Sequence, residues 1–207
     1  METLAEMFER SASRNPDESA QLYKGGVYSR ALANTDAVDA PPDGEYAALT
    51  YGELHDVVRY LAAGFRALGL EAGQRVGLFA DTRMEWAQCD LGLLSAGAVV
   101  TTVYESSSPA QVQYLLSDSG ASGVVVENEE LLERVLQMSG ALDLRFVVSM
   151  DDLPAEHEDA DGVYTLDEVY EQGRGAFDEA AYQSWLDDRS PEDLATLIYT
   201  SGTTGQP

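Results

Sequence analysis

The clearest hydrophobic pattern in the chain begins at Thr50. Apolar residues then recur every three or four positions, at Leu54, Val57, Val58, Leu61, Ala62, Phe65 and Leu68. This spacing places them on one face of a helix. Thr50 and Glu53 form a capping-box pair, in which each side chain accepts a hydrogen bond from the other residue's backbone N–H. With Gly69 as the expected C-terminal stop, the pattern predicts a helix from Thr50 to about Gly69.

Short apolar runs rich in β-branched residues alternate with helical patterns along the rest of the chain. Strands are predicted over residues 75–80, 98–104, 122–127, 144–150 and 194–200. Helices are predicted over residues 83–96, 109–118, 129–138, 165–175 and 178–188, with Asp81 or Thr82, Ser108 and Asn128 as N-caps of the first three. Such alternation with short connections is typical of parallel βαβ units. The sequence therefore predicts an α/β fold with a mostly parallel sheet flanked by helices.

Three other segments have weaker patterns. A first helix is expected over residues 2–14, ended by Asn15-Pro16. Residues 28–46 are expected to form loops and short strands, and residues 151–162 a solvated acidic loop. Lys24 lies in "YKGGVYS", which suggests a turn.

Charge is the unusual feature of the composition. The chain has 37 Asp and Glu residues against 12 Lys and Arg, a formal net charge of −25 and an isoelectric point near 4.1. Such a surface repels nucleic acid and anionic lipid, because binding to either relies on basic contacts. The acids are spread along the chain, and Lys24 is the only lysine. We expect a halophile's protein, since molar salt shortens the Debye length to roughly 3 Å and screens the self-repulsion.

The cysteine content and the hydropathy of the chain bear on its cellular location. Cys89 is the only cysteine, which excludes an intrachain disulfide and a cysteine-based zinc site. The N-terminal stretch lacks the apolar core of a signal peptide, and the run "LGLLSAGAVVTTVY" is too short for a membrane span. We expect a folded cytoplasmic protein without a transmembrane segment, and an oligomer is compatible with these observations.

The candidate chemistry lies in "LIYTSGTTGQP", where residues 200–205 are all Thr, Ser or Gly. Glycine lets the backbone approach a ligand closely, and consecutive N–H groups can form an anion-binding nest. At the carboxyl end of a strand, such a loop lies where α/β sheets bind ligands, so a polyphosphate is the expected guest. Gly202 and Gly205 are too close together for a Walker A loop. A flexible polar turn is the alternative interpretation.

The same residues resemble the phosphate-loop signature of the adenylate-forming enzymes, which include acyl-CoA synthetases, luciferases and the adenylation domains of peptide synthetases. Residues 48–121 look like the corresponding part of that family. Within them, "RMEW" and "YESSSPAQVQYLLSDSGA" look most like long-chain fatty acyl-CoA synthetases. The resemblance covers nearly the whole chain. It implies that residues 1–207 are the N-terminal portion of the AMP-binding synthetase/ligase domain, with the N-terminal part of its fold.

The family reaction joins a carboxylic acid, here a fatty acid, to coenzyme A in two steps. The carboxylate attacks the α-phosphorus of Mg²⁺-bound ATP, giving an acyl-adenylate and pyrophosphate, and the thiol of coenzyme A then displaces AMP. Donors aimed at the departing pyrophosphate stabilise the charge that it gathers. Carried over by motif, the residues expected to contact ATP are Thr200, Ser201, Gly202, Thr203, Thr204 and Gly205, with the Thr204 hydroxyl also near Mg²⁺.

Other parts of the family machinery have no match in these residues. The family uses a Lys or Arg directly after the position of Pro207, a later adenine- and ribose-binding segment, a glutamate near the metal, and a lysine in a C-terminal domain. Lys24 lies too near the N-terminus to replace that lysine. The resemblance therefore implies a fragment, truncated within the phosphate-loop motif, that holds no catalytic residue and does not complete the reaction alone.

Three alternatives stay open. The chain could be a non-catalytic nucleotide- or phosphate-binding module, an unfolded relic, or part of another adenylate-forming enzyme such as a short- or medium-chain acyl-CoA synthetase.

The remaining candidate residues have simpler interpretations. We expect His55 to be partly buried, His157 to be solvated among acids, and Cys89, Trp86 and Trp185 to pack in the interior. Four residues follow strands and could approach a ligand: Asp81, Thr82, Arg83 and Tyr104. Helix capping is sufficient to explain Asp81 and Thr82.

Overall fold

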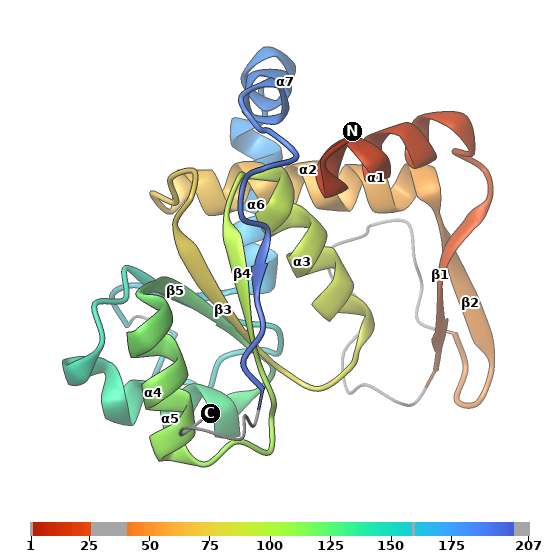
Figure 1. The fold of residues 1–207 in the computed structure, drawn as a ribbon. Helices are drawn as coiled ribbons and strands as arrows, with labels where there is room; N and C mark the ends of the chain where they lie inside the picture. The colour runs from red at the N-terminus through yellow and green to blue at the C-terminus, as the bar shows by residue number, and fades with distance from the viewer. Residues whose placement is uncertain (1, 26–40, 159, 201–207) are drawn as a thin grey trace.

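The computed structural model describes residues 2–25, 41–158 and 160–200. Its centre is a six-stranded sheet in the order β7-β6-β5-β3-β4-β8, with every pair of neighbours parallel (Figure 1). These strands are β3 (Arg75–Phe79), β4 (Val99–Val103), β5 (Ala121–Val126), β6 (Phe146–Ser149), β7 (Val163–Thr165) and β8 (Thr196–Leu197). A separate antiparallel pair consists of β1 (Ser19–Lys24) and β2 (Tyr46–Thr50). The predicted α/β fold with a mostly parallel sheet is confirmed.

Helices cover both faces of the sheet. The first face packs against α1 (Leu4–Arg14), α2 (Tyr51–Ala67), α3 (Met84–Ser95), α6 (Leu166–Ala176) and α7 (Glu179–Asp187). The second face packs against α4 (Pro109–Ser119) and α5 (Glu129–Met138), which a 3-10 turn, η1 (Ser139–Ala141), follows. Along β3, Val76 and Leu78 belong to the first core and Phe79 to the second. The strands are thus buried on both sides, as is usual for a parallel sheet.

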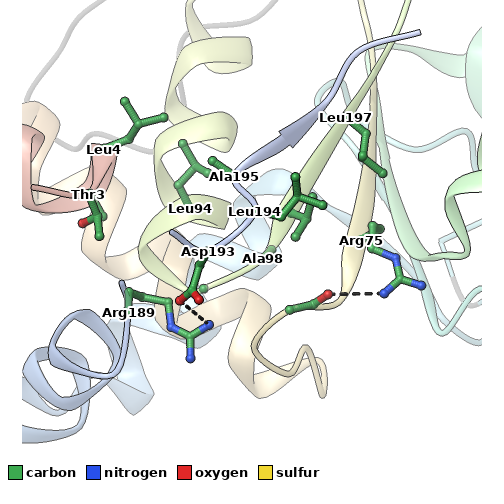
Figure 2. A pocket seen from close by; sticks show the side chains of 14 residues that line it. Thr3, Leu4, Arg75, Leu94, Ala98, Arg189, Asp193, Leu194, Ala195 and Leu197 are labelled. Atoms are coloured by element: carbon green, nitrogen blue, oxygen red, sulfur yellow. Dashed lines mark hydrogen bonds and ion pairs between the residues drawn. The ribbon is translucent and has the colours of Figure 1, made fainter. Parts of the chain in front are cut away.

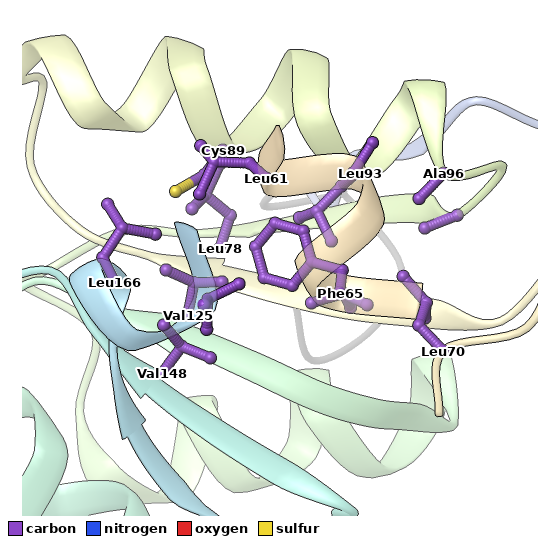
Figure 3. Close-up of a cluster of buried hydrophobic side chains, with 14 of the residues drawn as sticks. Leu61, Phe65, Leu70, Leu78, Cys89, Leu93, Ala96, Val125, Val148 and Leu166 are labelled. Carbon is purple, nitrogen blue, oxygen red and sulfur yellow. The ribbon is translucent and has the colours of Figure 1, made fainter. Parts of the chain in front are cut away.

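The first core joins helices that are distant in sequence. In Figure 3, Phe65 of α2 and Leu166 of α6 lie over Val125 and Val148 of the sheet. Fully burying a side chain of this size stabilises the fold by about 1.5–3 kcal/mol. As predicted, Cys89 is fully buried, and Trp86 and Trp185 pack against this core.

A glycine contact brings α2 and α6 unusually close. A Cβ added to Gly173 would lie 1.8 Å from the Tyr60 carbonyl oxygen and 2.6 Å from the Gly64 nitrogen. Because both atoms belong to the backbone, neither can move aside as a side chain would. Beside this contact the Tyr60 ring meets Tyr170 and Phe177 edge-on, with centroids 5.6 and 5.4 Å apart.

Most of the predicted helix ends are confirmed. Thr50 with Glu53 and Ser108 with Gln111 form complete capping boxes, and Asn128 caps α5. The first helix begins at Leu4 rather than at residue 2, because Thr3 is its N-cap.

The predicted helix over residues 83–96 is confirmed as α3, but its predicted N-cap, Asp81 or Thr82, was wrong. Its N-cap is Arg83, which makes no side-chain capping bond. The Asp81 carboxylate instead accepts a hydrogen bond from the Thr82 N–H at 2.6 Å, so neither residue caps the helix.

Short strands account for the other differences. β7 was not predicted because its length, Val163–Thr165, is too short to show a period, and β8 is shorter than the predicted 194–200. Lys24 ends β1, opposite Tyr46, rather than lying in a turn. The segment 151–162 is only partly solvated, since Leu153 and Ala160 pack against the second core. Within the described residues no helix combines the length and apolar character that a membrane crossing requires.

Candidate functional site

The strand β8 brings Thr200, the first residue of the candidate motif, to the carboxyl edge of the sheet. It runs parallel to β4, with Val100 opposite Thr196, and the Thr196 hydroxyl donates to the Val100 carbonyl at 2.9 Å. Parallel neighbours end on the same side, so Thr200 and the β4–α4 connection share the edge where such sheets bind ligands. Thr200 is exposed there. The other predicted contacts to ATP, Ser201, Gly202, Thr203, Thr204 and Gly205, lie outside the described residues.

Tyr199 fixes the chain directly before that loop. Its hydroxyl donates to Asp118 Oδ2 on α4 at 2.8 Å, and its ring meets Tyr114 edge-on with centroids 6.4 Å apart. Burial and the Asp118 carboxylate raise the pKa of Tyr199 to about 12, so the phenol stays protonated and donates at neutral pH. This contact leaves no signal in the sequence, because its two residues are 81 positions apart.

Arg134 of α5 holds the neighbouring β4–α4 connection. Its Nη1 lies 3.2 Å from the Glu105 carbonyl oxygen and 3.4 Å from that of Ser107. Its Nη2 lies 2.6 Å from Glu130 Oε1. The guanidinium thus orients backbone at the same edge to which Tyr199 and Thr200 lead from β8.

A cavity of about 290 Å³ opens at the carboxyl ends of β3 and β4. Its lining consists of Ala80, Asp81, Thr82, Trp86, Thr102, Val103, Tyr104 and Glu105. Three of the four strand-end candidates therefore surround one space. The Asp81 N–H donates to Glu127 Oε2 at 2.8 Å, which fixes the turn after β3 to the end of β5.

Arg83, the fourth candidate, is buried and bound to carboxylates. Its Nε and Nη2 lie 2.9 and 2.8 Å from the two oxygens of Glu85, and its Nη1 lies 2.9 Å from Asp151 Oδ1. Only 2% of the Arg83 side chain and 1% of the Glu85 side chain are exposed. Burial acts to lower the pKa of Arg83, but Glu85 and Asp151 outweigh it and raise this pKa. Arg83 is thus an internal counter-ion that joins the ends of β3 and β6, not a ligand for phosphate.

The side chains described at the carboxyl edge carry more negative than positive charge. Asp81, Glu105, Glu127 and Asp151 lie at it, and Arg83 is already paired. Hydroxyls and backbone N–H groups of a Gly/Ser/Thr loop suit phosphate oxygens, whereas the surrounding carboxylates suit a hard divalent cation. The donor set therefore fits a polyphosphate that arrives with Mg²⁺ better than a bare anion.

A second cavity, of about 350 Å³, lies at the opposite, amino edge of the sheet (Figure 2). Leu94, Ala98 and Leu194 give it apolar walls, and Leu4 of α1 contributes to its lining. It lies at the opposite ends of the strands from Thr200.

Both histidines have carboxylate partners. His55 Nε2 lies 2.7 Å from Glu9 Oε2, and the other oxygen of Glu9 accepts a hydrogen bond from the Tyr182 hydroxyl at 2.6 Å. His55 is half-buried, as predicted. The prediction that His157 is solvated was wrong: its Nε2 lies 2.5 Å from Glu133 Oε1, and 19% of its side chain is exposed. The turn that carries His157 folds back onto α5.

Comparisons with known proteins agree with the motif. The profile of the family described as "AMP-binding enzyme" matches residues 8–207. The chain is 37% identical over 166 residues to the long-chain-fatty-acid–CoA ligase FadD15 of Mycobacterium bovis, covering 80% of this chain and 26% of that protein. It is 34% identical over 160 residues to the long-chain-fatty-acid–CoA ligase ACSBG1 of Rattus norvegicus, covering 77% of this chain and 22% of that protein.

The fold has counterparts among solved structures. A long-chain-fatty-acid-CoA ligase (FadD1) from Archaeoglobus fulgidus superposes with a TM-score of 0.73 at 19% identity, covering 98% of this chain and 35% of that one. The chain thus spans about a quarter of the length of the curated relatives that it matches. From the profile and the sequence identities together, the chain belongs to the family of AMP-binding enzymes.

Proposed function

We propose that residues 1–207 form the N-terminal portion of the AMP-binding domain of a long-chain fatty acid–CoA ligase, and that they hold the phosphates of ATP. The whole protein would convert ATP, a fatty acid and coenzyme A into acyl-CoA, AMP and pyrophosphate. The observation that carries the proposal is the course of β8, which leads to Thr200, the first residue of "TSGTTG", at the carboxyl edge of the sheet. The relatives FadD15 and ACSBG1, both named long-chain-fatty-acid–CoA ligases, support the substrate class.

In this proposal the loop residues act as hydrogen-bond donors. Backbone N–H groups of Gly202 and Gly205 and the hydroxyls of Thr200, Ser201 and Thr203 bind the β- and γ-phosphates. The Thr204 hydroxyl would help to hold Mg²⁺. Mg²⁺ neutralises charge on the phosphate oxygens when it is bound. Tyr199 and Asp118 keep the start of the loop in place, which limits the ordering that ATP has to impose.

No catalytic residue is assigned within residues 1–207. The fatty-acid and coenzyme A sites are proposed to be built mainly by other parts of the full-length enzyme. We therefore expect the 207-residue chain alone to form neither acyl-adenylate nor acyl-CoA.

A chimera tests this function. Residues 1–207 would replace the matching quarter of FadD15, and acyl-CoA formation would be measured with a long-chain fatty acid. We expect activity, and we expect T203A with T204A to lower kcat/KM by about 10²–10³, because donors to a developing anion contribute on this scale. S184A, an exposed serine on α7, is the control. An alanine double variant with the parent rate would refute the assignment of the loop. Because the fatty-acid site is proposed to lie mainly outside residues 1–207, the substrate class is tested in the full-length enzyme, where equal use of acetate and a long-chain fatty acid would refute it.

The composition supports a high-salt cytoplasm as the location. Raising KCl from about 0.1 M to about 1 M shortens the Debye length from about 10 Å to about 3 Å. For a chain of net charge −25, we expect the thermal unfolding midpoint to rise across this range. A midpoint that does not change with KCl would contradict the halophilic origin.

A further inference from the structure

A histidine and two glutamates converge where the β6–β7 connection meets α5. One potential ligand atom from each of Glu133, Glu156 and His157 lies within 4.8 Å of the other two. Across residues 2–25, 41–158 and 160–200, no other three His, Cys, Asp or Glu side chains bring ligand atoms this close. The group lies away from the candidate phosphate loop in sequence and has no role in the function proposed above.

The backbone holds two of these residues in place without a ligand. Glu133 projects from α5, whose Leu132 and Val135 are fully buried in the second core. The His157 N–H donates to the Pro154 carbonyl at 2.8 Å, and the His157 carbonyl accepts from the Ala160 N–H at 3.1 Å. Helix and turn are therefore anchored independently, so little ordering is needed to bring the ligands together.

The spacing suits a small divalent cation. His157 Nε2 and Glu133 Oε1 are 2.5 Å apart and share a hydrogen bond. Ligand atoms around a tetrahedral zinc ion, bonded at about 2.0–2.1 Å, are roughly 3.3 Å from one another. The pair would have to open by less than about 1 Å, and Glu156 is exposed and free to rotate toward the same point.

His55 forms a comparable histidine–glutamate pair with Glu9, but no third potential ligand lies beside it within the described residues. Both oxygens of Glu9 are occupied, one by His55 and one by the Tyr182 hydroxyl. Burial acts to raise the pKa of Glu9, but the hydrogen bonds from His55 and Tyr182 outweigh it and lower this pKa. The His55 pair is thus a closed structural contact, whereas the His157 pair has a further carboxylate beside it.

We propose that Glu133, Glu156 and His157 bind one divalent transition-metal ion of the zinc type, with water completing the coordination. One imidazole nitrogen with two carboxylate oxygens is a ligand set that zinc accepts. The ion would tie the acidic connection between β6 and β7 to α5. Its role is structural and independent of acyl-CoA formation.

Proton NMR of the 207-residue chain tests the site directly, because the chain contains only two histidines. Zn²⁺ would be titrated in excess MgCl₂, which saturates carboxylate sites that have no nitrogen ligand. We expect the ring signals that H157Q removes to shift and to saturate at one equivalent, while those of His55 stay unchanged. Parallel, unsaturating shifts of both histidines, or no shift, would refute the site.

Variants distinguish binding by three specific ligands from non-specific attraction of Zn²⁺ to the negatively charged chain. We expect E133Q and E156Q each to weaken Zn²⁺ binding at least about tenfold, in line with the effect of disturbing a metal's ligand shell. E192Q removes the same charge from an exposed residue on the segment before β8 and should bind as the parent does. If E133Q or E156Q binds as tightly as E192Q, the three-ligand site is wrong.

Discussion

The two ends of β3 each place an arginine at the sheet edge, and the two side chains are held in opposite ways. At the amino end, Arg75 donates to backbone carbonyls, through Nε to Ser119 at 2.7 Å and through Nη1 to Gly73 at 3.4 Å. At the carboxyl end, Arg83 is buried and contacts Glu85 and Asp151. The first arginine contacts neutral groups beside an apolar cavity, and the second contacts carboxylates at the carboxyl edge of the sheet.

The difference lies in the charge of the partners of each arginine. Removing Arg75 leaves two neutral carbonyl groups without this donor, whereas removing Arg83 leaves the Glu85 carboxylate buried without its counter-ion. A buried charge without a partner is far more destabilising than a lost hydrogen bond. The carboxyl end of β3 thus depends on a buried ion network, whereas Arg75 at its amino end is held by neutral groups.

The largest effect is expected from R83M. We predict a loss of about 3–5 kcal/mol in the free energy of unfolding, the range seen when one partner of a buried ion pair is removed. Chemical denaturation in molar KCl would measure it. The double variant R83M/E85L, which removes both charges, should recover most of the loss. A loss below about 1 kcal/mol for R83M would show that the network contributes little.

D90N tests how much a partly buried carboxylate without a cationic partner destabilises the fold. Asp90 lies on α3, the helix that also carries Glu85. No hydrogen bond or ion pair within the described residues holds Asp90, and burial raises its pKa to about 6. The charged form is therefore disfavoured in the folded state, so Asp90 destabilises the protein above pH 6 and this penalty disappears as pH falls toward 4.

We accordingly predict that D90N stabilises the protein by about 1–2 kcal/mol at pH 7. The gain should fade between pH 6 and pH 4 in a series of denaturant titrations. D187N, at an exposed position on α7, is the control. A gain that stays constant with pH would mean that Asp90 is not titrating as described.

R75M is the matched test for the amino edge. We predict a loss of about 1 kcal/mol, the usual contribution of a hydrogen bond to a backbone carbonyl. The same denaturation measurement as for R83M gives the comparison directly. Equal losses for R75M and R83M would remove the distinction between the two edges.

The smallest change in stability is expected from Y199F. The ring contact with Tyr114 remains while the hydrogen bond to Asp118 is lost, so we predict a change within about 0.5 kcal/mol. In the FadD15 chimera, however, the KM for ATP should rise several-fold, because the start of the loop is less fixed. Y46F, at an exposed tyrosine of β2, is the control. An unchanged KM would show that Tyr199 does not position the loop.

The sequence predicted those features that are encoded locally. The α2 helix, its capping box and the strands β3 to β6 follow from apolar spacing and adjacent polar residues. The strand β7 and the pairing of Lys24 in β1 depend on neighbours brought by the fold, and no periodic pattern marked them. Asp81 was expected to be a helix cap because its position before α3 suited that role, but its N–H and carboxylate have other partners.

In the candidate site, too, the local motif could be predicted from the sequence, whereas the partners that are distant in sequence could not. The resemblance supplied residues 200–205 as a contiguous motif, and their contacts with ATP stay predictions. The groups around them could not be predicted, because Asp151 is 68 positions from Arg83 and Asp118 is 81 positions from Tyr199. His157 was misassigned for the same reason, since its partner lies on α5, 24 positions earlier.

The position of β8 at the end of the sheet has a practical consequence. Among the described strands it pairs only with β4, and Leu194 and Ile198 beside it expose 57% and 67% of their surface. A strand whose second edge is unpaired and whose flanking residues are apolar can form backbone hydrogen bonds with a strand of another molecule. Sedimentation of the purified chain should therefore become faster as its concentration rises, and dilute samples are the appropriate ones for spectroscopy.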